Sequence, residues 1–386
     1  MSISRRDLRL SRRPDARGVV TAATVFALAL ASCTTPHTYE PSLHPPTHEQ
    51  GVATTAFVTR PWSEVDIAAA YPKNDLARRV AFLMACDVSA KSSDASALAE
   101  SAALLEIYKS STTAEEFAKE IQERFELVEC VPLDAQIAGA PLMTGYATVV
   151  VDARVQEDPD FNYPIFGDVR VNHQEFAALP RRELMALPAA RTDVIAWVRD
   201  PLSLALVETN GTAHLLIETS EGKREARISR VATNGRAWTS LGSALASRGL
   251  LDAKTYTLND VIREATSNPA IAHEALLDNE RVVFFASTRA DLFPPTVGLQ
   301  GGKLVAGYSC AADQSVYPAG SILVTTDQEQ GSTAPRAARL VFVHDAGGAI
   351  TGPRRVDAYF GEGMEALYRA GEMRAAIGVY RLRLRK

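Results

Sequence analysis

The residues best suited to chemistry lie near the C-terminus, where an apolar, β-branched run ends at Asp345 and the glycine pair Gly347 and Gly348 follows. A second acid, Asp357, lies inside the next short apolar run, and Asp313 follows an earlier one. Such runs predict buried strands, and paired glycines allow a tight turn and the close approach of a ligand. Carboxylates at strand ends beside open space are typical of sites that cleave polysaccharides, although an ordinary strand–turn–strand unit carries the same residue types.

Two β-rich regions separated by helices are predicted to position these acids. The expected strands lie near residues 148–151, 215–218, 226–228, 281–285, 321–324, 340–343 and 380–384, and the expected helices near 74–128, 238–249 and 257–278. Capping signals are predicted at Thr112 or Thr113 with Glu115 or Glu116, and at Thr257 with Asp260. In the first helical region, one helical face carries Leu76, Val80, Leu83 and Met84. We expect that face to pack in the core.

Several segments, in order along the chain, resemble those of one known family. They are residues 144–146 (Thr-Gly-Tyr), 196–201, 234–242, 282–285, 345–354, 356–363 and 369–373. Together they resemble the membrane-bound lytic murein transglycosylase A family, whose C-terminal region is named for three aspartates. No single short motif carries the resemblance, because the segments extend from about residue 140 to the end of the chain.

The resemblance implies a mainly β, α+β fold. It consists of a double-psi β-barrel domain and an inserted small β-barrel domain, with a glycan-binding groove between them. The domains we expect are a signal peptide with a lipobox at 1–33, a flexible tether at 34–60, an N-terminal helical part of the barrel domain at 61–145, the inserted domain at 146–280 and the C-terminal barrel at 281–386.

The family's activity is non-hydrolytic cleavage of the β-1,4 bond between N-acetylmuramic acid (MurNAc) and N-acetylglucosamine (GlcNAc), which leaves a 1,6-anhydromuramyl end. The attacking group is the sugar's own C6 hydroxyl, so one carboxyl group can act first as acid and then as base. By match to the motif, Asp345 is that group, and burial is expected to raise its pKa. The resemblance makes Asp357, Asp313, Gly347, Gly348 and Tyr146 substrate-binding residues. For Asp357 and Asp313, structural hydrogen bonding in barrel turns is the alternative.

Residues 207–211 read Val-Glu-Thr-Asn-Gly, where the family has glutamine-glycine-serine-glycine, and the family's paired tyrosines become Tyr146 and Ala147. We expect these departures to lie in regions that contact substrate. A non-catalytic peptidoglycan-binding lipoprotein on the same fold therefore stays open as a second function. A hydrolase that uses water on the same bond is a third.

The N-terminus has the features of an export signal. An arginine-rich stretch is followed by an apolar run over residues 18–31, and Leu30-Ala31-Ser32-Cys33 resembles a lipobox. Lipidation of Cys33 would anchor the protein at the periplasmic face of the bacterial outer membrane after export by the Sec or twin-arginine route. Thr34 and Thr35 favour the outer membrane, because no aspartate follows the cysteine. An ordinary signal peptide or an uncleaved anchor is the alternative.

Composition and spacing narrow the list of partners. The net charge of −5 lacks a basic footprint, which argues against nucleic acid. The histidines and cysteines fit no metal pattern, and we expect no cofactor. The family resemblance implies peptidoglycan glycan strands as the partner, and we expect a monomer. In an oxidising compartment Cys86 and Cys130 are the cysteines most suited to a disulfide, and three buried free thiols, with Cys310, are the alternative.

Overall fold

The computed structural model describes residues 55–72, 75–132, 141–219, 222–288, 298–327 and 335–386. All of them belong to one compact unit of the chain. The predicted signal peptide, Cys33 and the tether up to residue 54 lie outside the described residues. The last six residues of the predicted tether, Thr55–Arg60, form the strand β1. Among the described residues, no helix is both long and apolar enough to span a bilayer.

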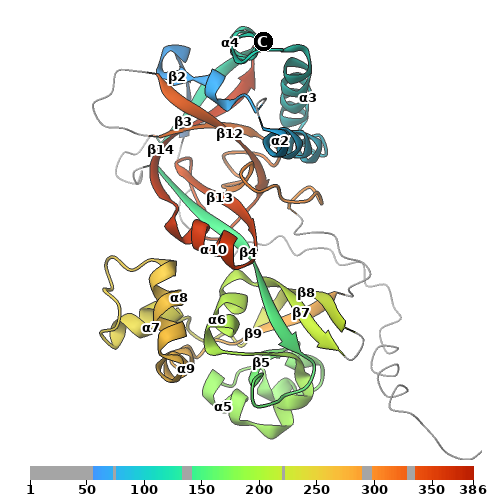
Figure 1. Cartoon of the computed structure of the whole chain (residues 1–386), viewed down its shortest axis with the longest axis vertical. Coiled ribbons are helices and arrows are strands. Elements are labelled where there is room, and N and C mark those ends of the chain that lie inside the picture. Colours follow the sequence, from blue (N-terminus) through green and yellow to red (C-terminus); the bar gives the residue numbers. More distant parts are fainter. Residues whose placement is uncertain (1–54, 73–74, 133–140, 220–221, 289–297, 328–334) are drawn as a thin grey trace, which may run out of the picture. The chain divides into compact units, whose positions relative to one another are not determined.

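A closed ring of strands forms the barrel (Figure 1). In ring order the strands are β4 (Leu142–Arg154), β13 (Arg355–Glu362), β10 (Ser309–Ala312), β12 (Arg336–Asp345), β11 (Ile322–Asp327) and β14 (Arg374–Leu384), which pairs back to β4. The pairs β10–β12 and β13–β4 are parallel, and the others in the ring are antiparallel. Closure leaves the ring without an unpaired edge. The predicted α+β class is confirmed.

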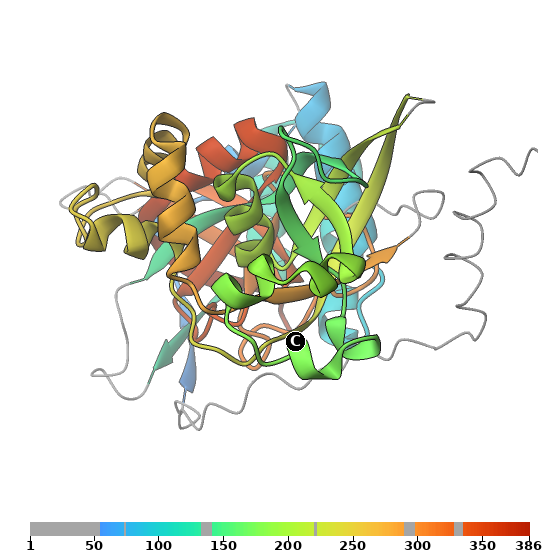
Figure 2. The same ribbon diagram turned by 90° about the horizontal axis from the view of Figure 1, so that it is seen from below.

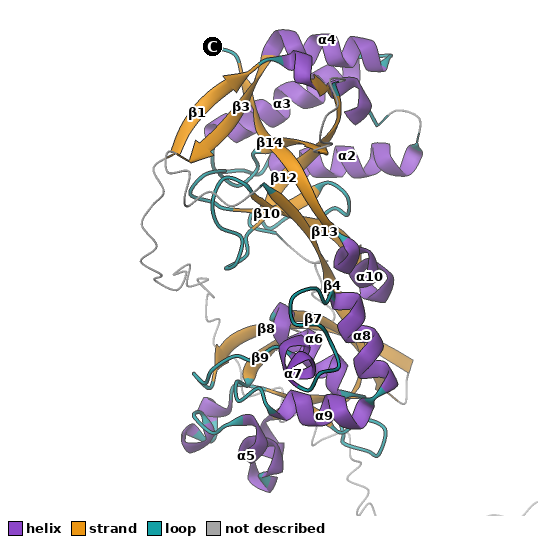
Figure 3. Ribbon diagram, turned by 90° about the vertical axis from the view of Figure 1, so that its left-hand side faces the viewer, coloured by secondary structure: helices purple, strands orange, loops and turns teal. Residues whose placement is uncertain are grey.

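Strands and helices from the N-terminal part extend this barrel. β3 (Phe125–Pro132) pairs with β14, and β1 pairs with β3. The helices α2 (Leu76–Ser89), α3 (Ala95–Ser110) and α4 (Ala114–Arg124) pack on β12, β14 and β3 respectively (Figure 3). A capping box of Thr113 and Glu116 begins α4, as predicted. The helix ends at Arg124, so Phe125 lies in β3 and not in the helix.

The predicted core face of α2 is wrong. Leu76, Val80, Leu83 and Met84 are 73%, 48%, 38% and 40% exposed. The opposite face packs inward, with Phe82 and Cys86 fully buried. Phe82 makes ring contacts with Tyr108 and with Tyr308. Both faces of α2 are apolar. The face that carries the Phe82 ring beside small side chains is the one that packs closely against the barrel.

The insert begins where β4 leaves the barrel and enters a second sheet. In this sheet β4 pairs with β7 (Thr212–Thr219) and β6 (Val194–Val198); β8 (Gly222–Thr233) and β9 (Val283–Thr288) follow β7, and β5 (Tyr163–Phe166) pairs with β6. The helices are α5 (Arg181–Ala186), α6 (Pro201–Asn210), α7 (Leu241–Ser247), α8 (Leu258–Ser267) and α9 (Pro269–Leu277). Figure 2 shows α7–α9 on one side of the insert and the β7–β8 hairpin on the other.

The helix predicted at 257–278 is two helices. α8 begins with the predicted capping box of Thr257 and Asp260. It ends before Asn268, and Pro269 begins α9. Proline cannot continue a helix but suits the first position of a new one. A further helix, α10 (Gly363–Glu372), connects β13 to β14 and packs on β4.

The predicted disulfide is absent. Cys86, Cys130 and Cys310 are free and buried. Cys86 lies in the core cluster under α2, whereas Cys130 lies in a different cluster, inside the barrel. The alternative of three buried thiols is the arrangement in the structure.

Candidate active site

Two of the predicted acids come together on either side of one strand. β10 lies between β12 and β13, and Ala311 of β10 is paired both with Asp345 of β12 and with Asp357 of β13. The register of β4 against β13 then places Thr144 opposite Asp357. The Thr-Gly-Tyr segment and both aspartates therefore meet in one part of the barrel.

Asp345 is half-buried and is held by uncharged donors. The Tyr146 hydroxyl donates to its Oδ2 at 2.8 Å, and the backbone N–H of Ala346 donates to its Oδ1 at 2.9 Å. Burial raises the pKa of Asp345, and Asp357 adds to the rise, while Tyr146 and Arg227 oppose it. The balance favours a carboxyl group that keeps its proton at higher pH than an ordinary aspartate.

Tyr146 is fixed by its own neighbours. Its ring lies 5.2 Å from the ring of Tyr359, whose hydroxyl is 3.0 Å from Thr148 Oγ1. Burial raises the pKa of Tyr146 well above its ordinary value, so the hydroxyl stays a donor. A Cβ on Gly145 would lie 2.8 Å from the backbone of Ala370, so this position has to be glycine for α10 to pack on β4. The predicted contact between Tyr146 and substrate stays a prediction.

Asp357 is the second acid of the pair. Thr144 Oγ1 donates to its Oδ1 across the parallel β4–β13 pair. Burial raises the pKa of Asp357, and the hydrogen bond from Thr144 and the charge of Arg355 oppose that rise. The Oδ1 atom of Asp357 is therefore occupied by a hydrogen bond from β4.

Asp313 orders the loop that follows Asp345. Its Oδ2 accepts from the backbone N–H of Gly352 at 2.6 Å, and its Oδ1 accepts from the N–H and the hydroxyl of Ser315. Both oxygens are thus used within the barrel turns. In the same loop Gly348 is exposed, and a Cβ added there would meet nothing within 4 Å, so this side of the loop is open.

Sequence reasoning missed His344, which directly precedes Asp345. The side chain is fully buried, with Nε2 3.0 Å from Ser89 Oγ and Nδ1 2.8 Å from Ser309 Oγ. Burial lowers the pKa of His344 to about 3, so the ring is neutral at physiological pH. The histidine ties the end of β12 to α2 and β10. No local spacing signals this, because Ser89 is 255 positions away in the sequence.

The insert also contributes charge to the site. Arg227 of β8 is half-buried. Burial lowers its pKa, and the charges of Glu362 and Asp345 oppose that change. Glu362 Oε2 is 3.7 Å from His214 Nδ1, and His214 is the cross-strand neighbour of Arg227. Arg227 is therefore a positively charged residue near Asp345. Sequence reasoning did not identify it.

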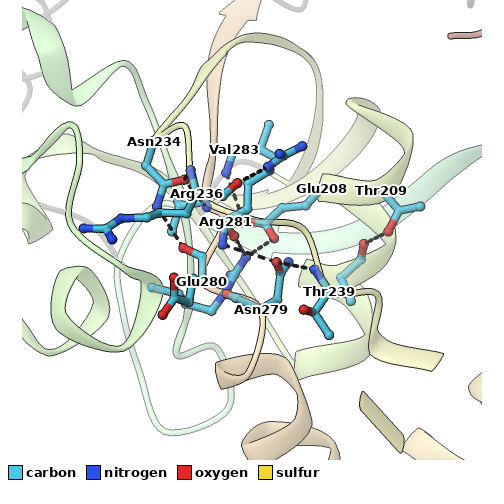
Figure 4. Close-up of polar contacts among 12 residues, drawn as sticks. Glu208, Thr209, Asn234, Arg236, Thr239, Asn279, Glu280, Arg281 and Val283 are labelled. Atoms are coloured by element: carbon cyan, nitrogen blue, oxygen red, sulfur yellow. Dashed lines mark hydrogen bonds and ion pairs between the residues drawn. The ribbon is translucent and has the colours of Figure 1, made fainter. Parts of the chain in front are cut away.

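Residues 207–211 depart from the family's sequence, and we expect them to contact substrate. The structure places Glu208 elsewhere. Glu208 lies in α6 with its side chain 2% exposed, and the Arg181 guanidinium donates to its Oε2 at 2.5 Å (Figure 4). The other oxygen accepts from the N–H of Val283 at 3.4 Å. The carboxylate therefore faces the interior of the insert and is not available to a substrate. No cluster of three or more metal-binding side chains occurs in the described part of the chain.

Family models match both the barrel and the insert. Residues 308–383 match the family model of the 3D domain, and residues 142–286 match that of the MltA specific insert domain. The insert model starts and ends near the predicted limits of 146–280, and the predicted domain division as a whole stays a prediction. The chain belongs to the family of membrane-bound lytic murein transglycosylase A.

Named relatives and solved structures agree with this family. The chain is 28% identical to the membrane-bound lytic murein transglycosylase A of Escherichia coli K12 over 233 residues, which are 59% of this chain and 61% of that protein. It is 26% identical to the Vibrio cholerae protein of the same name over 253 residues, which are 64% and 66% of the two chains. The chain thus aligns with 61% of the length of the E. coli relative.

The fold is that of the solved members. E. coli MltA with bound chitohexaose has a TM-score of 0.65 and 23% identity, covering 86% of this chain and 95% of that one. The lytic transglycosylase LtgG of Burkholderia pseudomallei has a TM-score of 0.61 and 22% identity, covering 86% and 96%.

Proposed function

We propose that this protein is a peptidoglycan lytic transglycosylase that cleaves the β-1,4 bond between MurNAc and GlcNAc and forms 1,6-anhydromuramyl ends. The observation that carries the proposal is the state of Asp345. Its carboxyl group has a raised pKa, accepts from Tyr146 and Ala346, and has no ion pair among the described residues. An acid that must both give and take a proton needs this combination.

In the proposed reaction, protonated Asp345 donates its proton to the glycosidic oxygen as the bond from C1 of MurNAc breaks. The C6 hydroxyl of the same sugar then attacks C1 and gives its proton to the Asp345 carboxylate, which restores the acid. The attacker is part of the substrate, so it needs orientation but no activated water. Tyr146 would hold the carboxyl group in one orientation through both transfers, and the charge of Arg227 would favour its ionised state.

The remaining predicted residues have supporting roles in this proposal. Asp357 disfavours ionisation of Asp345 before the reaction. Asp313 holds the glycine loop through Gly352. Gly348 leaves one side of that loop open to the sugar, whereas Gly347 lies against the Ile350 side chain, where a Cβ would come within 2.9 Å. Substrate contacts by Asp357 and Asp313, and the groove between the domains, are part of the proposal.

The proposed location is the periplasmic face of the outer membrane. The E. coli and V. cholerae relatives are named as membrane-bound proteins. We infer that this chain is exported by the Sec or twin-arginine route, is anchored through a lipid on Cys33 and acts as a monomer on glycan strands. No cofactor enters the proposed reaction.

Digestion of purified sacculi separates this function from its alternatives. The products should carry anhydromuramyl ends, which mass spectrometry identifies because they are lighter by one water than reducing ends. Reducing ends would instead indicate a hydrolase, and binding without products would indicate a peptidoglycan-binding lipoprotein. The changed segment at 207–211 no longer favours that last alternative, because the Glu208 side chain is internal.

A further inference from the structure

One face of α2 is an apolar surface with no covering element in the described part of the chain. We call Leu76, Val80, Leu83 and Met84 the α2 stripe. Its members are spaced by three to four residues or adjoin, so they share one side of the helix, and their exposed fractions range from 38% to 73%. On the neighbouring helix α3, Leu98 is 41% exposed and Ala99 and Ala102 are also exposed. Single exposed apolar residues are normal, but a contiguous set marks an interaction site.

A helix of the same domain shows the ordinary arrangement. α4 buries Phe117 and Ile121 and presents charged residues, such as the pair Lys119 and Glu123, to solvent. α2 instead packs Phe82 against the barrel and presents leucine, valine and methionine on its opposite face. The contrast shows that barrel packing does not account for the α2 stripe.

We propose that the α2 stripe lies on a lipid bilayer. The proposal rests on the anchoring through Cys33 proposed above. Residues 34–54 separate that cysteine from β1, and a chain of this length spans at most about 75 Å. The barrel domain is therefore held close to the membrane that carries the anchor.

The size and charge of α2 suit an interfacial position. The helix has 14 residues, which is about 21 Å and too short to cross a bilayer, so its apolar face would enter only the boundary between headgroups and acyl chains. Arg79, in the first turns of the helix, is exposed and suits anionic headgroups, while its Nε donates to the Tyr108 hydroxyl at 3.3 Å. A lipid tether alone leaves a domain free to rotate, whereas a second contact fixes the orientation of the active site to the membrane.

Spin-label accessibility tests this placement in the complete, lipidated protein. L83C is labelled with a nitroxide and reconstituted on vesicles of phosphatidylethanolamine and phosphatidylglycerol; V171C, on a 77% exposed position of the insert, is the matched control. The native thiols at Cys86, Cys130 and Cys310 are buried, so background labelling should be low. Collision rates are measured with oxygen, which concentrates in lipid, and with a water-soluble nickel chelate.

The expected result is at least a tenfold higher ratio of oxygen to nickel collisions at position 83 than at position 171. High nickel access at both positions would overturn the proposal. Low collision rates with both reagents at position 83 would also overturn the proposal. They would indicate that protein covers the α2 stripe, from a second copy, a partner or the N-terminal segment. Failure to bind vesicles would overturn the anchor itself. Loss of sacculus cleavage with normal vesicle binding would overturn only the proposed enzymatic activity.

Discussion

Two acids, one in the barrel and one in the insert, differ in what holds them. Glu208 is paired with a guanidinium in the interior of the insert. Asp345 accepts only from a hydroxyl group and a backbone N–H. Burial raises the pKa of both acids, and at Glu208 the charge and hydrogen bond of Arg181 oppose that rise. Glu208 is enclosed and tied to a cation, so it serves structure, whereas Asp345 is half-buried, is held by neutral donors and can exchange a proton with a substrate. The type of donor therefore separates the structural acid from the proposed reactive one.

The network around Glu208 explains why the insert needs that acid. Arg181 also donates to the carbonyl oxygens of Asn279 and Arg281, and the Asn234 side chain donates to that of Glu280 (Figure 4). These contacts fix residues 279–283, the segment that leads from α9 into β9. β9 in turn pairs with β8, which carries Arg227. The structural acid thus supports the strand that brings a cation towards the reactive one.

The largest effect is expected from D345N. Asparagine can neither donate nor accept the proton, so the rate of anhydromuramyl formation should fall by about 10⁴-fold. Because burial raises the folded pKa of Asp345, its ionisation opposes folding at neutral pH, and this penalty is lost below the ordinary pKa of aspartate. D345N should therefore be as stable as the wild type or more stable at pH 7, and no more stable at pH 3. Thermal melts at both values check this, and retained cleavage would refute the assignment.

E208A should show the opposite pattern, with a large loss of stability. Removing one partner leaves the Arg181 charge buried and unpaired, which costs about 3–5 kcal/mol of unfolding free energy. Urea denaturation measures the loss. The double variant R181M/E208L, which replaces the pair with apolar groups, should recover most of it. A fully stable E208A would mean that the pair does not hold the insert together.

Y146F tests the neutral donor. The Tyr146 hydroxyl stabilises the ionised form of Asp345, so its removal should raise the pKa of that acid further. A hydrogen bond to a charged group contributes about 1.5–3 kcal/mol, which corresponds to about one to two pH units. The alkaline limb of the pH dependence of kcat/KM should move upward by that amount, while kcat falls because the carboxyl group loses its orientation. An unchanged limb would show that Tyr146 does not contact Asp345 in the working enzyme.

The sequence predicted the features that depend on residues close together in the chain. Asp345 and its glycine pair follow an apolar run, and the boxes at Thr113 and Thr257 join residues three positions apart. The parts it missed depend on distant partners, such as Arg181 with Glu208 or His344 with Ser89. The apolar face of α2 misled the prediction for a different reason. Both of its faces are apolar, so periodicity alone did not identify the one that packs inward.

The smallest effect is expected from R227A, which removes the cation that the insert brings near Asp345. The charge of Arg227 lowers the pKa of Asp345, so its loss should raise that pKa and move the alkaline limb of kcat/KM upward, in the same direction as Y146F. The shift should be under about one pH unit, because Arg227 is half-buried and solvent weakens its field. Raising the salt from about 0.05 M to about 0.5 M should shrink the difference between R227A and the wild type, since screening shortens the Debye length, but should leave the Y146F shift unchanged. Equal salt dependence of both variants would mean that Tyr146 and Arg227 act on Asp345 by the same route, and the distinction between neutral and charged partners would fail.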